Sequence, residues 1–558
     1  MTFSRVLKAL GNVLALVALV AYVGYLVVYV VYAVNLFQWP FDYDQGEGFE
    51  LYDAILFSRG ELPYKDNAVY PYYASNYPPL FHLLIIPLLP VFGPNVVAGR
   101  VVSFVATLVT GATISVIVRR KAGGWFIPLV SGLAYLSSSY VYQTGPLCRM
   151  HITMVMFEAL AIAFIAEFQH PKHGRRNLIL GLLMLILAGY TKQMAVFTVV
   201  AALSYVFLRD VKRSIVAGTA LAIVTGVIFW LLNVATDGQW WINTIQANAN
   251  EFEYLQTIAF FRQWFDLHAL FIILAVAYLV YELFWDRLSA YSLWFFFALG
   301  TGALSGKWGA GFNYFTTAVA AACVCSGLAL GRLVKDRSAE TVDWKAAFAT
   351  GNLRAALRNL RSTLRSFAVR RRLTLARPLF LVLIPLLYLL QAPRMLHLPT
   401  AGPVFGPVAQ VLGVGGAVTQ TDCMAYAYYD KMGYTQLGHL LTEDDYAAGE
   451  GLLAYVRASD GPVFSEEAML TLLDGRPVVT NPTQLRNLYL NGLLDTTDMV
   501  ERIDRQEFGV VLFRAQFYPD PVLQAIGQNY ATVDTVCMNG FNYGVLLPNR
   551  LSDGPADQ

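Results

Sequence analysis

The chain has few charged residues for its length. Of its 558 residues, 14% are Asp, Glu, Lys or Arg, whereas soluble globular chains carry about 25%. Hydrophobic residues make up 56%, and the mean hydropathy is +0.48. This composition excludes a disordered or collagen-like chain. The chain also has more apolar surface than the cores of soluble domains could bury. The sequence therefore predicts a polytopic α-helical membrane protein with a soluble part attached.

Cysteines and familiar catalytic motifs are also scarce. The five cysteines form no CxxC or Cys/His zinc spacing, so a structural zinc is not expected. No Walker loop, nucleophile elbow or HExxH occurs, and the glycines of 413–416 do not complete a dinucleotide fingerprint. Cys423 and Cys537 both lie in the polar C-terminal part and could pair outside the cytoplasm, which the sequence leaves open.

Long apolar runs are plentiful, and a bilayer span needs about 20 such residues. Eleven runs occupy 9–36, 95–118, 125–142, 151–168, 178–190, 194–208, 214–234, 267–285, 289–304, 314–334 and 378–397. The stretch 178–208 is almost continuous, and we predict two half-length helices with a turn at Thr191-Lys192-Gln193. The proline-rich run 78–92 is short and is predicted to be re-entrant or interfacial.

The distribution of charge sets the orientation of the predicted spans. With the N-terminus in the cytoplasm, most of the connections that fall inside are basic, as the positive-inside rule requires. The most basic is 335–377, with eleven Lys and Arg against three acids, while 398–558 has eight against nineteen. We expect a multi-pass protein of the plasma membrane with a transmembrane domain over 1–397 and an extracytoplasmic domain over 398–558.

Two of these segments have further features. The cytoplasmic insertion 335–377 carries arginines at helical spacing and is expected to lie on anionic membrane lipid. Base-reading motifs are missing from it, so no nucleic-acid partner is expected. The extracytoplasmic domain is predicted to be α/β. Its expected strands are 462–465, 478–480, 508–513 and 543–547, and its expected helices are 466–473, 483–490 and 521–529.

The first external loop, 37–94, concentrates the acidic residues. Asp42, Asp44 and Glu47 fall within six residues, directly after the first span and among glycines that allow sharp turns. Carboxylates at a membrane boundary can act as general bases or hold a metal ion. The aromatic and apolar surroundings favour packing onto the membrane domain over a solvated acidic loop.

Cations and other polar residues fall on the same predicted side of the membrane. They are Arg149, His151, Lys192, Gln193, Lys307, Asn313 and Tyr314. Such a set suits a substrate with an anionic phosphate, held by Arg and Lys while a carboxylate deprotonates an acceptor hydroxyl.

Short motifs in this order resemble the C-type (GT-C) membrane glycosyltransferases, in particular the protein O-mannosyltransferase and aminoarabinose transferase superfamily. The matching pieces are Asp44-Gln45-Gly46-Glu47-Gly48, Gly60-Glu61-Leu62-Pro63-Tyr64, Asn76-Tyr77-Pro78-Pro79-Leu80, Phe92-Gly93-Pro94, Gly99-Arg100, Arg149-Met150-His151, Thr191-Lys192-Gln193 and Asn313-Tyr314-Phe315. The chain has Gln45 where the family often has Glu, and His151 where it often has Asp.

The resemblance implies a GT-C fold and a polyprenyl-phosphate-linked sugar donor. It also implies inverting transfer on the outer face, with Asp44 or Glu47 as the base. Arg149 and Lys192 would bind the phosphate, with Lys307 a weaker third, and Tyr77 and His82 complete the expected substrate-binding set. The acceptor, whether protein, lipid or glycan, stays open.

One alternative function and the question of a metal remain at this point. A transporter or flippase of lipid-linked sugars could line its path with the same charges, although no internal repeat is present. We expect no cofactor and favour metal independence, but Asp42 and Asp44 have the spacing of metal ligands.

Overall fold

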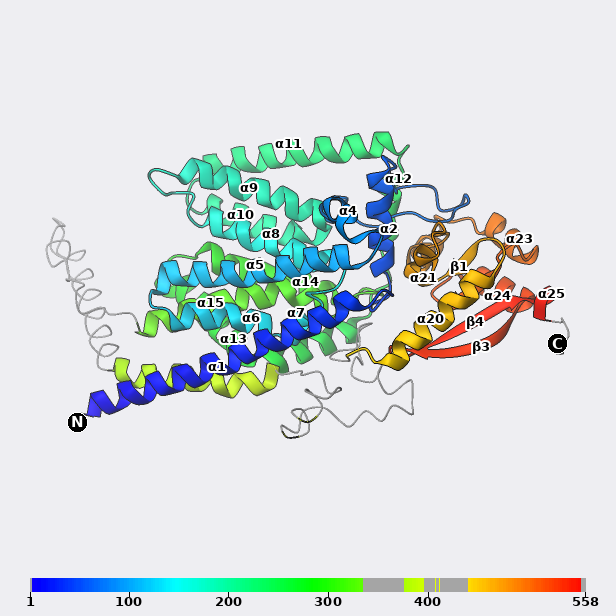
Figure 1. The fold of residues 1–558 in the computed structure, drawn as a ribbon. Coiled ribbons are helices and arrows are strands. Elements are labelled where there is room, and N and C mark those ends of the chain that lie inside the picture. The colour runs from blue at the N-terminus through cyan, green and yellow to red at the C-terminus, as the bar shows by residue number, and fades with distance from the viewer. Residues whose placement is uncertain (1–2, 335–375, 396–406, 408–410, 412–439, 553–558) are drawn as a thin grey trace.

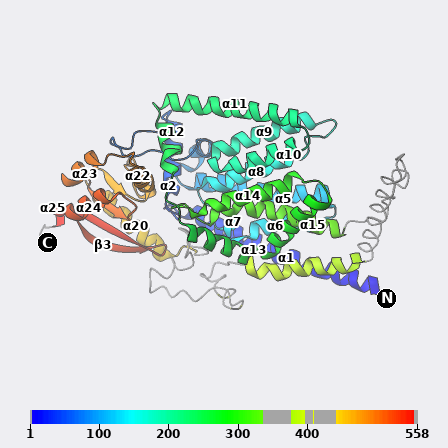
Figure 2. The same ribbon diagram turned by 180° about the vertical axis from the view of Figure 1, so that it is seen from behind.

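The computed structural model describes residues 3–334, 376–395 and 440–552, with the single residues 407 and 411. Most of the basic insertion, Cys423, the glycines of 413–416 and the predicted domain boundary at 397/398 lie outside the described residues. The described chain forms a bundle of long helices with a smaller α/β domain at one end (Figure 1). The N-terminal end of the first helix lies at the opposite end of the bundle, as the view from behind confirms (Figure 2).

Each of the eleven predicted apolar runs falls on helix in the bundle. These helices are α1 (Phe3–Gln38), α5 (Val97–Ala122), α6 (Phe126–Ser137), α7 (Ser139–Tyr142), α8 (Met150–Ile165), α9 (Gly174–Thr191), α10 (Val196–Phe207), α11 (Val211–Ala235), α13 (Tyr254–Trp285), α14 (Ala290–Ala303), α15 (Thr316–Val334) and the helix Ala376–Met395. Six helices among the described residues are long and apolar enough to cross a membrane. The protein is a multi-pass membrane protein, and the number of eleven crossings stays a prediction.

The stretch 178–208 is divided as the sequence predicted. Helix α9 ends at Thr191, Lys192 is extended (φ −158°, ψ 138°), and a 3-10 turn η2 (Gln193–Ala195) leads into α10. The run 78–92 forms only short pieces, α3 (Leu80–Ile85), η1 (Ile86–Leu88) and α4 (Leu89–Phe92). None of them is long enough to span a bilayer.

One helix starts earlier than its apolar run indicated. Helix α13 begins at Tyr254, well before the run that starts at residue 267, and its backbone leaves helical geometry at His268 (φ −124°, ψ 19°). The missed N-terminal part contains Gln256, Arg262 and Asp266 among its polar residues, so a search for continuous apolar runs passes over it.

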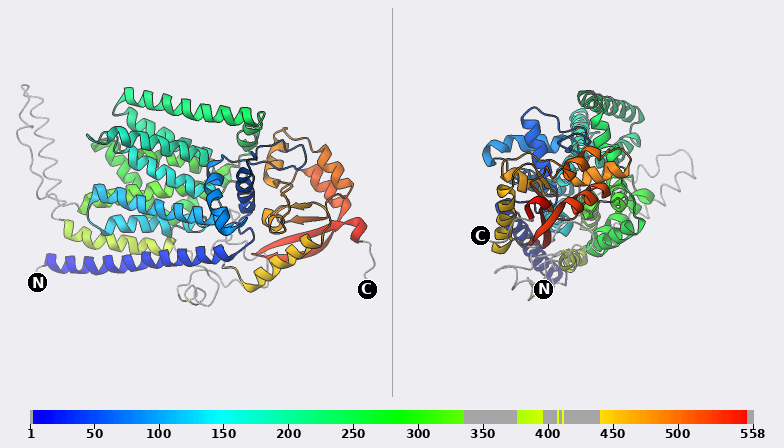
Figure 3. Two further views of the ribbon diagram at one scale, coloured as in Figure 1. Left: turned by 45° about the horizontal axis from the view of Figure 1, so that its top comes forward. Right: turned by 90° about the vertical axis from the view of Figure 1, so that its right-hand side faces the viewer.

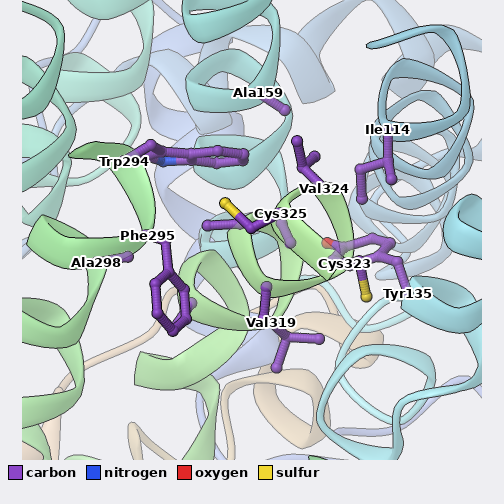
Figure 4. Close-up of a cluster of buried hydrophobic side chains, with 14 of the residues drawn as sticks. Ile114, Tyr135, Ala159, Trp294, Phe295, Ala298, Val319, Cys323, Val324 and Cys325 are labelled. Carbon is purple, nitrogen blue, oxygen red and sulfur yellow. The ribbon is translucent and has the colours of Figure 1, made fainter. Parts of the chain in front are cut away.

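The bundle core is built around α15, which packs against α5, α6, α13 and α14. Figure 4 shows Cys323 and Cys325 of this helix among Trp294, Tyr135 and other buried side chains. Both thiols are free and buried, as expected of packing residues. Helices α5 and α6 approach closely at Gly111 and Gly132, where an added Cβ on Gly132 would lie 2.4 Å from the Gly111 carbonyl oxygen.

The C-terminal part is an α/β domain, as predicted. Its elements are α20 (Glu443–Ala458), β1 (Val463–Ser465), α21 (Ala468–Leu473), α22 (Pro482–Leu490), α23 (Thr497–Asp504), β2 (Val510–Phe513), α24 (Asp520–Asn529), β3 (Tyr530–Met538), β4 (Phe541–Pro548) and α25 (Asn549–Ser552). The sheet order is β1-β2-β4-β3. Strand β1 runs parallel to β2, with Phe464 opposite Val511, and the other pairs are antiparallel.

One prediction for this domain was wrong, and one strand was not predicted. Residues 478–480 form no strand; Val478 and Val479 are instead buried in two different hydrophobic clusters beside the bundle. Strand β3 was missed, although Asn539-Gly540 at its end is a strong hairpin signal. Both residues have positive φ, 49° and 72°, as that turn requires. Cys537 in β3 is disulfide-bonded. Whether its partner is Cys423, which the sequence left open, stays open because Cys423 is not among the described residues.

Helix α2 (Glu47–Ser58) crosses the end of the bundle between the long helices and the C-terminal domain (Figure 3). It packs against α21 on one side and against α3 and α5 on the other. Ten of its twelve residues are buried. Helix α2, which belongs to the loop 37–94, is therefore enclosed between the two parts of the molecule, and several candidate functional residues gather beside it.

Candidate functional site

A buried ion pair fixes the loop between α1 and α2. Arg100 of α5 is fully buried and holds Glu47 through two hydrogen bonds, Nε to Oε1 at 2.9 Å and Nη2 to Oε2 at 2.7 Å. The same guanidinium donates to the carbonyl oxygens of Leu36, Trp39 and Phe41. Burial alone would raise the pKa of Glu47, but Arg100 and backbone amides lower it overall. This carboxylate is therefore ionised and holds the loop in place.

Asp42 faces the C-terminal domain. Its Oδ1 accepts from the Gly48 amide at 2.5 Å, and its Oδ2 accepts from the Met469 amide of α21 at 2.9 Å. Gly48 makes this contact close, because an added Cβ would lie 2.8 Å from the Met469 nitrogen. Burial raises the pKa of the neighbouring Glu467 well above its ordinary value, although Arg514, 2.8 Å away, opposes that shift. Asp42 thus serves to dock the two parts of the chain.

Asp44 and Arg149 form the pair at the centre of the site. Arg149 precedes α8 and donates from Nε to Asp44 Oδ2 at 2.7 Å, and its Nη2 donates to the Gln45 carbonyl. Asp44 Oδ1 is buried and has no hydrogen-bond partner among the described residues. Gly46 has φ +101°, and an added Cβ would lie 3.0 Å from the Arg149 guanidinium. One carboxylate oxygen of Asp44 is therefore held, and the other is available.

Lys192 lies at the break between α9 and α10 and faces the same space. It is 4% exposed, and its Nζ donates to His151 Nε2 at 2.6 Å. The ammonium lies 4.6 Å from the centre of the Tyr77 ring and 5.6 Å from that of Tyr314. No carboxylate pairs with it among the described residues. A lysine held by one imidazole and two ring faces lacks a counter-charge.

These residues share one cavity of about 60 Å³. Its lining comprises Asp44, Tyr77, Arg149, His151, Lys192, Gly309, Gly311, Phe312, Asn313 and Tyr314. Asn313 Oδ1 is buried there without a partner among the described residues. Two cations, one available carboxylate oxygen and an available amide oxygen thus face a small enclosed space at the C-terminal-domain end of the bundle.

A second cavity of about 90 Å³ adjoins the first through Tyr77, Arg149 and Gly309. The C-terminal domain supplies part of its wall with Asn481, Thr483 and Phe517. Gln45 also lines this cavity, and its side-chain amide nitrogen is buried without a partner among the described residues.

Glu466 holds the loop that carries Phe517. This fully buried carboxylate accepts hydrogen bonds from four consecutive backbone amides, those of residues 514–517, at 2.5 to 3.0 Å. The phenyl ring of Phe517 meets Trp308 edge to face, with centroids 5.3 Å apart. Trp308 belongs to the bundle and also lines the second cavity. Residues from both the bundle and the C-terminal domain therefore form the wall of this cavity.

Comparison with known proteins supports one fold. Over almost its whole length the chain is similar to ArnT from Cupriavidus metallidurans in the apo state, with a TM-score of 0.57, 12% identity, and 96% of this chain and 99% of that chain covered. The same ArnT bound to undecaprenyl phosphate gives a TM-score of 0.55 and 12% identity over 94% and 98% of the chains. The chain has the GT-C fold. Residues 76–240 also match the dolichyl-phosphate-mannose-protein mannosyltransferase family, and no curated protein matches the chain.

Within the GT-C fold, three residues predicted to bind substrate lie outside the first cavity, as do Asp42 and Glu47. Gln193 donates to the Thr244 carbonyl at 3.0 Å, and Lys307 donates to the Asn248 carbonyl at 2.5 Å. His82 of α3 belongs to a different group, with Glu50 and Asp53 of α2. The roles predicted for these three residues have not been tested, but their present contacts are elsewhere.

The sequence analysis gave no role to several residues that shape the site. Arg100 was noticed only as part of a motif, and Glu50 and Asp53 were not singled out, although their i, i+3 spacing places them on one helix face. The carboxylate of Asp53 is buried, which raises its pKa to about 7 against the opposing effect of His82. An apolar sequence context around a charged residue is the signal that could have drawn attention to all three.

Proposed function

We propose that this protein is a membrane glycosyltransferase that takes a sugar from a polyprenyl-phosphate donor. One observation carries the proposal: Asp44 Oδ1, without a hydrogen-bond partner among the described residues, shares a cavity with Arg149 and with Lys192, a buried lysine that no described carboxylate pairs with. The GT-C fold and the matched family agree with this chemistry.

The proposed reaction is a single displacement. The hydroxyl oxygen of the acceptor attacks the anomeric carbon of the sugar, and Asp44 accepts the proton of that hydroxyl. The bond between the anomeric carbon and the phosphate oxygen breaks at the same time. The products are the glycosylated acceptor and the polyprenyl phosphate. Among the described residues, Asp44 is the one carboxylate that lines the first cavity. A retaining reaction uses two carboxylates, one of them to form a covalent glycosyl intermediate, so we infer inversion.

Arg149 and Lys192 are assigned to the donor phosphate. Negative charge develops on the phosphate as it leaves, and cationic side chains already fixed around the cavity stabilise that charge with little reorganisation. A protonated lysine has no hydrogen-bond acceptor. In the hydrogen bond with the ammonium of Lys192, Nε2 of His151 must therefore be the acceptor. His151 therefore orients the ammonium towards the cavity.

Geometry favours Asp44 over Glu47 as the base. Both oxygens of Glu47 are occupied, by Arg100 and by the amides of Tyr43 and Cys148, and the residue is fully buried. Proton transfer to it would break the ion pair that holds the loop. We further propose, from the charge distribution, that the cavity opens on the extracytoplasmic face and that the N-terminus is cytoplasmic.

The test uses the purified full-length protein with a panel of labelled polyprenyl-phosphate hexoses and pentoses, and with candidate acceptors. Release of polyprenyl phosphate with transfer of label supports the proposal, and Asp44→Asn should reduce the rate by about 10²–10⁴. Asp66→Asn, in the same loop but exposed, is the matched control and should retain the rate. Movement of intact donor across vesicles without bond cleavage would instead support a flippase.

A further inference from the structure

Behind Arg149 lies a compact group of three side chains that can bind a metal ion. Glu50 and Asp53 are one turn apart on α2, and His82 faces them from α3. The Nε2 atom of His82 is 2.7 Å from Glu50 Oε2 and 3.5 Å from Asp53 Oδ2. One ligand atom from each residue lies within 4.8 Å of the other two. All three side chains are buried, with exposures of 0 to 4%.

The charges of this group are not fully balanced within the described part of the chain. Glu50 Oε1 is 3.6 Å from Arg149, but that guanidinium pairs more closely with Asp44, at 2.7 Å. Asp53 pairs with no Lys or Arg in the described part of the chain. A protonated His82 would supply one positive charge against two carboxylates. Burying charges without compensation is unfavourable, whereas one divalent cation would neutralise both carboxylates.

The outer contacts hold each carboxylate in the orientation that a ligand needs. The hydroxyl of Tyr73 lies 2.8 Å from Asp53 Oδ1, so the other oxygen, Oδ2, faces His82. Glu50 likewise has one oxygen towards Arg149 and one towards His82. The Nδ1 atom of His82 has no partner among the described residues, so the polar contacts of the ring are with the two carboxylates. Metal ligands are commonly oriented by such second contacts.

We propose that Glu50, Asp53 and His82 bind one divalent transition-metal ion. One imidazole nitrogen and two carboxylate oxygens form a borderline donor set, which suits Zn²⁺ or Mn²⁺. The ligands differ from Asp42 and Asp44, whose spacing first suggested a metal. The ion would join α2 to α3 and fix Glu50 against Arg149. These three are positioning residues, and the binding of the ion does not depend on the proposed transfer reaction.

The experiment measures metal content directly. Full-length protein in detergent is stripped with chelator, equilibrated with Zn²⁺ or Mn²⁺, freed of excess ion, and analysed by inductively coupled plasma mass spectrometry. We expect about one ion per chain for the wild type and a loss to background for Asp53→Asn and His82→Ala. The double substitution His170→Ala with His173→Ala removes an exposed histidine pair whose rings stack at 5.1 Å. It should leave the content unchanged.

Thermal unfolding provides a second measurement. It distinguishes a folded variant that has lost the ion from a variant that has misfolded. The added ion should raise the Tm of the stripped wild type and of the double histidine control, because binding to the folded state alone stabilises it. It should not raise the Tm of Asp53→Asn, a variant of nearly the same shape. A wild type that retains no ion and shows no shift with either metal would overturn the proposal, as would an Asp53→Asn variant that binds and shifts like the wild type.

Discussion

Lys192→Met should strengthen the fold and weaken ligand binding at the same time. Lys192 is 4% exposed, and its amino group has an imidazole but no carboxylate as a hydrogen-bonding partner among the described residues. Burying an ion without a counter-charge is costly, and methionine fills a similar volume without charge. We therefore expect a higher Tm for the variant in the absence of lipid phosphate.

The loss in affinity can be worked out from the same contacts. A hydrogen bond to a charged group contributes about 1.5–3 kcal/mol, which corresponds to a Kd for polyprenyl phosphate weakened by roughly 10- to 150-fold. Arg149 remains in the cavity, so binding should be reduced and not abolished. Lys172→Met, which removes an exposed lysine between α8 and α9, is the control and should change neither quantity.

The assay is a lipid titration followed by intrinsic fluorescence, with thermal unfolding of the same samples. An unchanged Kd would show that Lys192 does not contact the phosphate. A lowered Tm without lipid would show that the buried ammonium is compensated in a way the structure does not reveal. Either result would refute the reasoning, because both effects derive from one uncompensated charge.

Three further predictions follow from the same region. Arg100→Met leaves Glu47 buried and unpaired, so chemical unfolding should show a loss of about 3–5 kcal/mol; an unchanged midpoint would contradict the role of this ion pair. Gly46→Ala adds a Cβ at φ +101° and 3.0 Å from the Arg149 guanidinium, which should cost about 1–3 kcal/mol of strain and lower transfer rates; full activity would show that the guanidinium can shift freely. Burial raises the pKa of Glu467, so its contribution to stability is complete below the ordinary carboxyl pKa and is lost as pH rises through the raised value. The Tm of the wild type should fall over that range, whereas a Glu467→Gln variant should show a flatter profile in unfolding scans at a series of pH values.

The sequence was informative where charge is rare. In a chain with 14% charged residues, Asp44, Arg149 and Lys192 stand out among apolar neighbours, and the structure brings all three into one cavity. The break at Lys192 was predicted because two half-length helices preserve the order of basic connections. Both inferences rest on the cost of placing charge in lipid, which acts on each residue locally.

The sequence was uninformative where the outcome depends on distant partners. Asp44 and Glu47 look alike in the chain, and only the pairing of Glu47 with Arg100, on a helix that follows a long loop, separates them. Glu466 receives its role from amides of residues 514–517, which no spacing rule connects to it. Residues 478–480 have strand-like side chains but lie where two hydrophobic clusters meet, so tertiary packing overrode local preference.

The shared wall of the second cavity has a consequence for how such proteins could diversify. Asp44 and Arg149 sit at the bundle end, whereas Asn481, Thr483 and Phe517 come from a domain with its own sheet. Exchanging that domain would alter one side of the cavity and leave the charged centre intact. The replacement domain would have to keep the hydrogen bonds that join it to the bundle. Two of these are the Met469 amide to Asp42 and the Asn539 side chain to the Tyr43 carbonyl. The helical bundle with its charged centre could therefore be retained while the C-terminal domain is replaced.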